Sequence, residues 1–131
     1  MINVSQLNQR YGGSQILWDL NMDIAAGSRT CIMGRNGVGK TTLLKCLMGM
    51  LPAASGSITI NQQDVTRASI ESRANIGVGY VPQGRQIFPM LTVQENLEVG
   101  LPIREKGDRK IPEFIFDIFP RTLKLKKILI R

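Results

Sequence analysis

The sequence predicts an α/β fold, and three observations support this class. Short apolar segments typical of strands alternate along the chain with segments of helical periodicity. A glycine-rich octapeptide, residues 34–41, lies between one such strand and one such helix. No apolar run reaches the roughly 18 residues that are needed to span a bilayer. We therefore expect one domain, or part of one, built on a sheet that is parallel at its centre.

Five segments are predicted to form strands. Leu17–Ile24 alternates apolar and polar residues, as a half-buried strand does, and Ile2–Leu7 alternates more loosely, as an edge strand does. Ile76–Val81 is apolar and is expected to be buried. The other two are Ser28–Met33, which leads into the octapeptide, and Ser57–Ile60.

Two helices are predicted in the first 80 residues. The longer one, over residues 40–50, repeats leucines at helical spacing, and Pro52 follows its end. The shorter one lies around Ser69–Arg73, within the polar stretch Asn61–Asn75.

Two further helices are predicted after residue 90. Thr92 is expected to cap a helix over Val93–Val99, because Glu95 completes a capping box of the form T-x-x-E. Pro112–Phe119 has helical character, and Pro120 is expected to end that helix.

The octapeptide carries the strongest functional signal in the chain. It is Gly34-Arg35-Asn36-Gly37-Val38-Gly39-Lys40-Thr41, which reads G-x-x-x-x-G-K-T, the P-loop pattern. Its glycines let the backbone wrap phosphate groups, and the following helix adds the positive end of its dipole and unpaired first-turn N–H groups. Lys40 is expected to reach the β- and γ-phosphates, the Thr41 hydroxyl to bind Mg²⁺, and Thr42 to continue the site into the helix. The alternative is a glycine-rich turn that binds nothing.

The net charge of +7 is concentrated at one end of the chain. Residues 121–131 carry five basic side chains and no acidic one, so the first 120 residues, with 12 basic and 10 acidic side chains, carry only +2. Because only 5% of the residues are aromatic, the chain lacks the stacking platforms typical of nucleic-acid binding, and no nucleic-acid partner is expected. The first residues lack a basic and apolar leader, which favours a cytoplasmic protein. Cys31 and Cys46 are both expected to be buried free thiols.

Three further segments indicate which kind of P-loop protein this is. They are Tyr11-Gly12-Gly13 before the P-loop, Gly49–Ile58 at the end of its helix, and Tyr80-Val81-Pro82-Gln83 at the end of a predicted strand. Together with the P-loop, they resemble the nucleotide-binding subunits of ABC transporters over residues 1–120. A small-molecule kinase remains an alternative, whereas the guanine-reading N-K-x-D or T-K-x-D of a GTPase does not occur.

The resemblance implies roles for two residues outside the P-loop. Tyr11 would stack on adenine, and Gln83 would contact Mg²⁺ and the attacking water and touch the membrane subunits. Lys40 and Gln83 would then be the catalytic residues, Thr41 and Gln83 the metal ligands. A tyrosine ring can stack on any base, and a neutral amide can bind a hard cation and orient water. The alternatives are a surface tyrosine beside a turn and a solvated turn residue after Pro82.

The resemblance also implies partners and a transported solute. The segments Leu7–Leu17, Gly34–Thr42 and Pro82–Pro89 look like the ATPases of branched-chain amino acid and urea importers. Leu44–Gly49 and Pro112–Phe116 look closest to the urea ATP-binding subunit, so the resemblance implies urea as the first expected solute and branched-chain amino acids as the second. Such a subunit would bind ATP and Mg²⁺, pair with a second ATPase subunit, and lie at the inner face of the plasma membrane against membrane-embedded permease subunits. Residues 83–91 are expected to form the exposed hinge toward the permease, unless Phe88 and its neighbours pack inward.

The sequence departs from this family in its second half. No four apolar residues are followed by Asp-Glu, since Phe114-Ile115-Phe116-Asp117 is followed by Ile118, and neither an L-S-G-G-Q signature nor any histidine occurs. We expect a chain cut short, with an incomplete ATP-binding core over 1–82, the start of a helical subdomain over 83–120 and a divergent basic tail over 121–131. Such a chain would bind ATP without turning it over, and a nucleotide-binding fragment without catalysis is the alternative function. The tail could instead act at a membrane surface, although it lacks clear helical periodicity.

Overall fold

A computed structural model describes residues 1–84, 86–103 and 110–128 of the chain. The chain divides into two units, Met1–Tyr80 and Val81–Arg131. Among the described residues, no helix is both long enough and apolar enough to cross a membrane.

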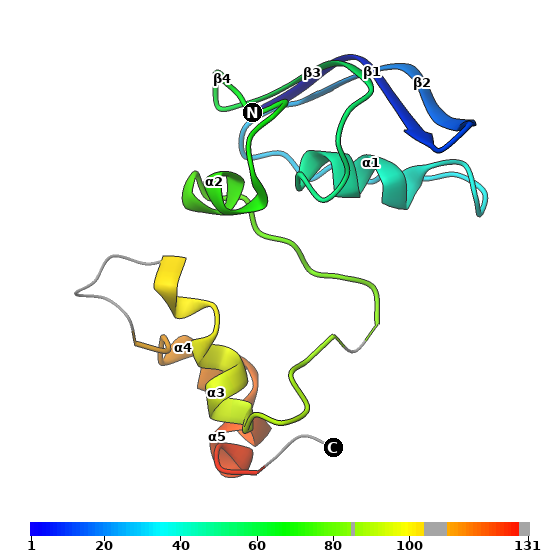
Figure 1. The fold of residues 1–131 in the computed structure, drawn as a ribbon. Coiled ribbons are helices and arrows are strands. Elements are labelled where there is room, and N and C mark those ends of the chain that lie inside the picture. The colour runs from blue at the N-terminus through cyan, green and yellow to red at the C-terminus, as the bar shows by residue number, and fades with distance from the viewer. Residues whose placement is uncertain (85, 104–109, 129–131) are drawn as a thin grey trace. The chain divides into compact units, whose positions relative to one another are not determined.

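The first unit is built on a four-stranded antiparallel sheet with the order β2-β1-β3-β4 (Figure 1). The strands are β1 (Ile2–Tyr11), β2 (Ser14–Ile24), β3 (Ser55–Ile60) and β4 (Gln63–Asp64). Tyr11 pairs with Ser14 across the tight Gly12-Gly13 turn, so β1 and β2 form a hairpin. Gly56 allows β3 to approach β1, because a Cβ at this position would collide with the backbone of Gln6.

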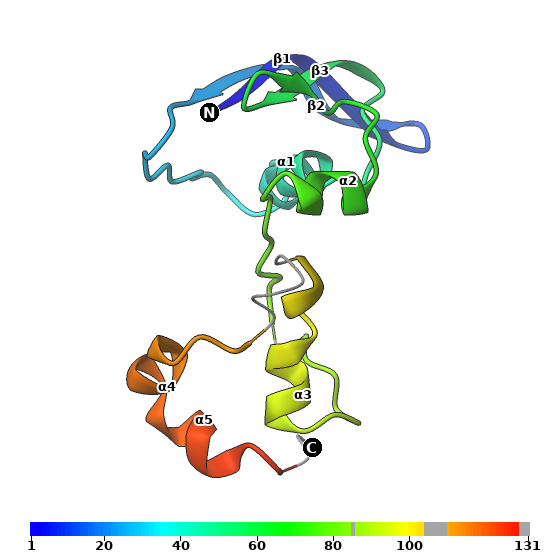
Figure 2. The ribbon, with the colours of Figure 1, turned by 90° about the vertical axis from the view of Figure 1, so that its left-hand side faces the viewer.

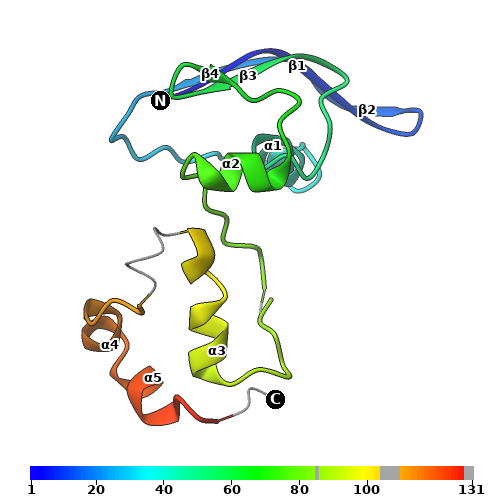
Figure 3. The ribbon, with the colours of Figure 1, turned by 60° about the vertical axis from the view of Figure 1, so that its left-hand side comes forward.

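Two helices pack on one side of this sheet, as Figure 2 and Figure 3 show. They are α1 (Lys40–Leu47) and α2 (Ile70–Asn75). The α1 helix places one apolar face on the sheet and leaves Leu44 exposed. The buried core consists of Val4, Leu7, Leu17, Leu43, Cys46, Leu47, Ile58, Ile60 and Val65. Strand alternation and helical periodicity therefore bury the same cluster from both layers.

The α1 helix ends earlier than the sequence predicts, because Gly49 stops it. Gly49 has φ 76°, a left-handed conformation that favours glycine. Its N–H donates to the Cys46 carbonyl at 3.0 Å, and the Met50 N–H donates to the Lys45 carbonyl at 2.9 Å. This pair of bonds is the Schellman motif, which closes the carboxyl end of a helix.

The structure corrects the predicted sheet in three respects. The edge position predicted for Ile2–Leu7 is wrong, since β1 lies between β2 and β3. The parallel centre is also wrong for the described residues, where every strand pairing is antiparallel. Ser28–Met33 and Ile76–Val81 form no strand. An apolar pattern indicates that a segment has a buried face. A strand forms, however, only where a neighbouring strand hydrogen-bonds to its backbone N–H and C=O groups. The sheet of the first unit does not include these two segments.

The second unit is helical. It contains α3 (Val93–Glu98), a short 3₁₀ helix η1 (Leu101–Ile103), α4 (Phe114–Ile118) and α5 (Pro120–Leu125). The predicted capping box at α3 is confirmed: the Glu95 N–H donates to the Thr92 hydroxyl at 3.2 Å, and the Thr92 N–H donates to the Glu95 carboxylate at 2.7 Å. The Thr92 hydroxyl also donates to the Glu95 carboxylate at 2.7 Å. The two bonds that the carboxylate accepts, first that from the Thr92 N–H and then that from the hydroxyl, hold the pKa of Glu95 below its ordinary value.

Two other predictions are corrected. Cys46 is buried and free, as predicted, but Cys31 is exposed, because its segment is not part of the sheet. The start of the basic tail, which lacks clear helical periodicity in the sequence, is helical in the structure. The α4 helix ends at Ile118, and Pro120 begins α5. Proline suits the first turn of a helix because its missing N–H would have no partner there. Residues 129–131 of the tail lie outside the described part of the chain.

Candidate functional site

The P-loop sequence forms a glycine turn that rests on β2. Gly37 has φ 84° and Gly39 has φ 99°, so both adopt the left-handed conformation that favours glycine. A Cβ on Gly39 would lie 2.9 Å from the Leu17 side chain and 3.2 Å from that of Ile16. Gly39 is therefore required twice, for its backbone conformation and for the close packing of the loop on the hairpin.

The Lys40 side chain folds back into this loop. Its Nζ donates to the carbonyl oxygens of Gly34 and Arg35, both at 2.7 Å. The ammonium group therefore lies at the mouth of the loop, where its partners among the described residues are neutral oxygens. A phosphate would offer it a charged acceptor, and hydrogen bonds between ionised groups are roughly twice as strong as neutral ones.

The first turn of α1 supplies the remaining groups of the P-loop. Among the described residues, no side chain caps this helix, and its first turn contains no acidic residue. The dipole and the first-turn N–H groups of the helix thus meet no competing anion from its own turn. Thr41 is exposed, whereas the Thr42 side chain is buried beside the core. The Thr41 hydroxyl is consequently the one that can reach a ligand at the helix end.

The structure places Tyr11 on the hairpin that supports the loop. It ends β1, and its side chain is 46% exposed. Leu17 lies on β2, the second strand of that hairpin, and is one of the residues that pack against Gly39. The same hairpin thus carries both the predicted adenine platform and the support of the loop.

Gln83 belongs to the second unit, where it is exposed after Pro82. Its predicted roles toward Mg²⁺ and water stay predictions. The side chains of Phe88 and Met90, which follow it, are exposed, that of Met90 by 84%. The second unit therefore presents apolar side chains at this loop instead of packing them inward.

Asn96 holds this loop in place and was not singled out by the sequence. Its Oδ1 accepts from the Phe88 N–H at 2.8 Å, and its Nδ2 donates to the carbonyls of Phe88 and Thr92, each at 3.0 Å. One amide side chain on α3 thus fixes the backbone at both ends of residues 88–92. The only available signal was an asparagine inside a predicted helix, where this residue type is not favoured.

Arg73 is a second residue that sequence reasoning missed. It is only 2% exposed and lies beneath the carboxyl end of α1. Its guanidinium donates to the carbonyls of Cys46 at 2.8 Å, Leu47 at 2.7 Å, Thr66 at 3.2 Å and Ala68 at 3.2 Å. Burial lowers the pKa of Arg73 and raises that of the nearby Cys46 thiol. A buried cation is therefore satisfied by backbone carbonyls alone, at the negative end of the helix that begins at the P-loop.

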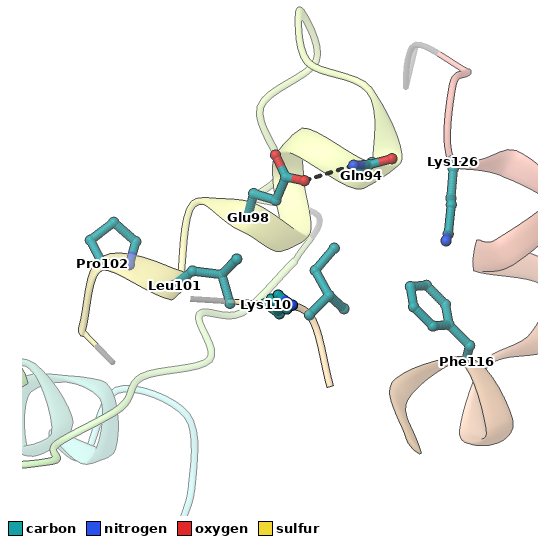
Figure 4. Close-up of a pocket in the computed structure, with 8 residues that line it drawn as sticks. Gln94, Glu98, Leu101, Pro102, Lys110, Phe116 and Lys126 are labelled. Carbon is teal, nitrogen blue, oxygen red and sulfur yellow. Dashed lines mark hydrogen bonds between the residues drawn. The ribbon is translucent and has the colours of Figure 1, made fainter. Parts of the chain in front are cut away.

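The second unit also contains a cavity of about 470 Å³ (Figure 4). Polar residues Gln94, Glu98, Lys110 and Lys126 line it together with Phe116 and three aliphatic residues. Gln94 donates to Glu98 at 2.7 Å, and the Lys126 ammonium lies 4.3 Å from the centre of the Phe116 ring. Three of its four polar side chains thus contact another residue of the same unit.

The donor set near the P-loop suits a nucleotide-bound Mg²⁺ rather than an independent metal site. In the described part of the chain, no three Cys, Asp or Glu side chains cluster to hold a metal. Mg²⁺ usually keeps several waters and takes phosphate oxygens with one or two protein ligands. The exposed hydroxyl of Thr41 fits that requirement.

Comparison with known proteins agrees with this geometry. The family model described as ABC transporter matches residues 17–129. A branched-chain amino acid transport ATP-binding protein, LivF of Archaeoglobus fulgidus, is 36% identical over 110 residues, which cover 84% of this chain and 47% of that protein. A sulfate/thiosulfate import ATP-binding protein of Bacillus cereus is 35% identical over 127 residues, covering 97% of this chain and 35% of that protein. The chain thus spans half or less of the length of these relatives.

The fold comparison gives the same result. A solved structure of the ATP-binding subunit of an ABC transporter superposes with a TM-score of 0.83, covering 98% of this chain and 54% of that one. Its sequence identity is 22%, so the match bears on the fold. The predicted P-loop NTPase fold of the ABC type, with its antiparallel β region, is confirmed.

Proposed function

We propose a function from one premise: this chain belongs to the ABC transporter family of ATP-binding cassettes. The chain is the nucleotide-docking part of an ATPase that energises transport. The observation that carries this proposal is the position of the Lys40 ammonium, which lies 2.7 Å from the carbonyls of Gly34 and Arg35 at the mouth of the P-loop.

The proposed ligand is ATP with Mg²⁺. The P-loop amides and Lys40 would hold the β- and γ-phosphates, and the Thr41 hydroxyl would be a ligand of Mg²⁺. That ion neutralises charge on the phosphates, and the positive end of the α1 dipole adds to the same field. The chain's own contribution is binding and positioning.

Tyr11 is the proposed adenine platform. Its side chain is exposed on the hairpin that carries the P-loop, which leaves a ring face for stacking. Photolabelling with 8-azido-ATP tests the site, because it marks the residues beside the base. We expect label in the peptide that contains Tyr11, competed by ATP and lost in Lys40→Ala. Label that is spread over the chain, or that ATP does not compete, would reject this site.

The proposed partner is a membrane-embedded permease that receives the loop over residues 83–91, of which Arg85 lies outside the described residues. Phe88 and Met90 are exposed there, and Asn96 fixes the loop backbone. Crosslinking from single cysteines at these two positions to a co-expressed permease tests the contact. The exposed native thiol of Cys31 must first be replaced by serine. A cysteine at Glu113, which is also exposed in the second unit, is the matched control. Equal yields from the loop and the control would contradict the assignment.

Import of branched-chain amino acids is the proposed transport process, with urea as the second candidate solute. The named function of the Archaeoglobus relative supports the first, while the urea assignment rests on the resemblance of Leu44–Gly49 and Pro112–Phe116. Either transport process would place the assembled protein at the inner face of the plasma membrane, beside a second ATPase subunit. Crosslinking of the cysteine variants at positions 88 and 90 to each candidate permease, co-expressed in turn, discriminates the two without requiring ATP turnover.

We further propose that the 131-residue polypeptide binds ATP without measurable turnover. The sequence contains no apolar run ending in Asp-Glu and no L-S-G-G-Q segment, so it offers neither a carboxylate that polarises water nor a signature loop for a partner. Loss of a general base alone removes a factor of ~10²–10⁴ in rate. We expect hydrolysis at background and no nucleotide-dependent dimer in sedimentation. Steady turnover that Lys40→Ala abolishes would contradict this, and Asp117 would then be the first carboxylate to test.

A further inference from the structure

Residues 118–128 form a surface on the second unit that nucleotide binding does not use. Large apolar side chains are exposed along it: Ile118 by 61%, Phe119 by 57% and Leu123 by 52%. Single exposed apolar residues are ordinary on protein surfaces, but three within six residues concentrate apolar surface in one short segment.

The same segment is strongly basic. Arg121, Lys124 and Lys127 are exposed, and no acidic residue occurs after Asp117. Lys126, in contrast, directs its ammonium group over the Phe116 ring of its own unit (Figure 4). Three cations therefore remain at the surface, interleaved with the apolar side chains.

The structure supplies the order that the sequence pattern lacks. Pro120–Leu125 is helical as α5, and the Thr122 N–H and hydroxyl donate to the Phe119 carbonyl at 2.9 and 2.6 Å. The end of the segment is tied to the first turn of α3, whose amides donate to the carbonyls of Lys126 at 3.1 Å and Ile128 at 3.2 Å. The exposed side chains thus belong to a segment whose backbone is held by hydrogen bonds.

We propose that residues 118–128 bind directly to the surface of an anionic lipid bilayer. The apolar side chains would enter the boundary between headgroups and acyl chains, while the three cations would meet the anionic headgroups, the arrangement of a peripheral membrane-binding segment. This contact is independent of the permease and of nucleotide.

The mixture of apolar and basic side chains in this segment favours a lipid surface over other acidic partners. Single-stranded nucleic acid is held by a basic groove with aromatic platforms, whereas Ile118 and Leu123 offer aliphatic surface that a phosphate backbone does not cover. A bilayer interface accepts both parts of the segment at once.

Cosedimentation of the 131-residue protein with vesicles tests the proposal. One set contains phosphatidylglycerol and phosphatidylcholine in equal amounts, and the other contains phosphatidylcholine alone. We expect binding to the anionic set only, weakened by added salt. The triple variant Arg121→Gln/Lys124→Gln/Lys127→Gln should bind about a hundredfold less, since each cation contributes separately. Arg10→Gln/Arg29→Gln/Arg67→Gln removes three exposed charges from the first unit and is the matched control.

A second measurement reports insertion. Trp18 is the only tryptophan, so Phe119→Trp in a Trp18→Phe background places a single reporter in the segment. We expect a blue shift of its emission on adding anionic vesicles, and quenching by brominated lipid.

Any one of three results in the vesicle experiments would overturn the proposal. They are equal binding to both vesicle sets, equal losses in the two triple variants with circular dichroism unchanged, and no blue shift while the protein sediments with vesicles. Tighter binding to single-stranded RNA or to poly-glutamate than to vesicles would assign the segment to another class of partner and would also reject it.

Discussion

Arg73 closes the carboxyl end of α1 through Leu47: its Nη1 donates to the Leu47 carbonyl oxygen at 2.7 Å. The P-loop opens the other end of the same eight-residue helix at Lys40. One buried arginine therefore fixes the helix whose first turn is the proposed phosphate site. Gly49 leaves room for this arginine, because a Cβ at Gly49 would lie 2.9 Å from the Arg73 Nε.

Arg73→Ala should destabilise the first unit by about 3 kcal/mol, because it leaves buried carbonyls without a donor. Arg73→Lys should recover part of that loss, since an ammonium group can serve fewer of the four carbonyls. The free energy of unfolding in urea measures both. Arg67→Ala, which truncates a nearby exposed arginine, is the control and should change it little. Equal losses at the two positions would show that the carbonyl contacts of Arg73 do not stabilise the fold.

Gly39→Ala should cost about 2–4 kcal/mol, from the left-handed backbone and from the contact of the new Cβ with Leu17. Gly13→Ala is the matched control, because a Cβ at Gly13 meets open space. Urea unfolding without nucleotide measures the difference. If the loop shifts to relieve the contact, we expect ATP binding to fall instead of stability. A Gly39→Ala protein with unchanged stability and unchanged ATP binding would contradict the described loop.

Local sequence patterns predicted what local physics decides. The capping box of Thr92 and Glu95 and the glycine loop before Lys40 are set by residues within a few positions of one another, and both appear where the sequence placed them. Arg73 could not be found in this way. Asn96 bonds to Thr92 and Phe88, only 4 and 8 residues away, but it gave no signal beyond its residue type. Arg73 bonds to carbonyls 26 and 27 residues away, and a buried arginine has no distinctive pattern.

The predicted strands Leu17–Ile24 and Ser57–Ile60 form, whereas other parts of the predicted sheet failed for a related reason. Ile2–Leu7 carries an edge pattern but gains neighbours on both sides, and Ser28–Met33 carries a buried pattern but gains none in the described sheet. Hydrophobic alternation records which face of a strand meets a core, while the choice of neighbours depends on distant segments.

Unfolding of α3 should depend on pH through Glu95. Its folded pKa is lowered, so its contribution to stability is complete above the unfolded value of roughly 4.3 and is lost as the pH falls through that value toward the lower folded pKa. Glu95→Gln should flatten this dependence. Thr92→Val removes the hydroxyl but keeps the backbone N–H, and should retain part of it. Helix content by circular dichroism between pH 3 and 6 in about 0.1 M salt measures the effect; the same slope in wild type and Glu95→Gln would reject the assignment.

Tyr11→Ala should weaken ATP binding but leave tripolyphosphate binding unchanged, because only the base would stack on the ring. Trp18→Ala, which removes another exposed aromatic residue from the same hairpin, should affect neither ligand. Calorimetric titration with both ligands measures the four affinities. Equal losses for ATP and tripolyphosphate in Tyr11→Ala would mean that Tyr11 supports the hairpin rather than the base.

Thermal unfolding with and without Mg·ATP tests the central assignment, a phosphate site closed by Lys40. At a ligand concentration 100-fold above its dissociation constant, binding should stabilise the wild-type chain by roughly 2.7 kcal/mol. Lys40→Ala should lose most of this protection, because the phosphates lose their counter-charge, whereas Lys45→Ala on the last turn of the same helix should keep it. Equal protection of wild type, Lys40→Ala and Lys45→Ala by Mg·ATP would contradict the account.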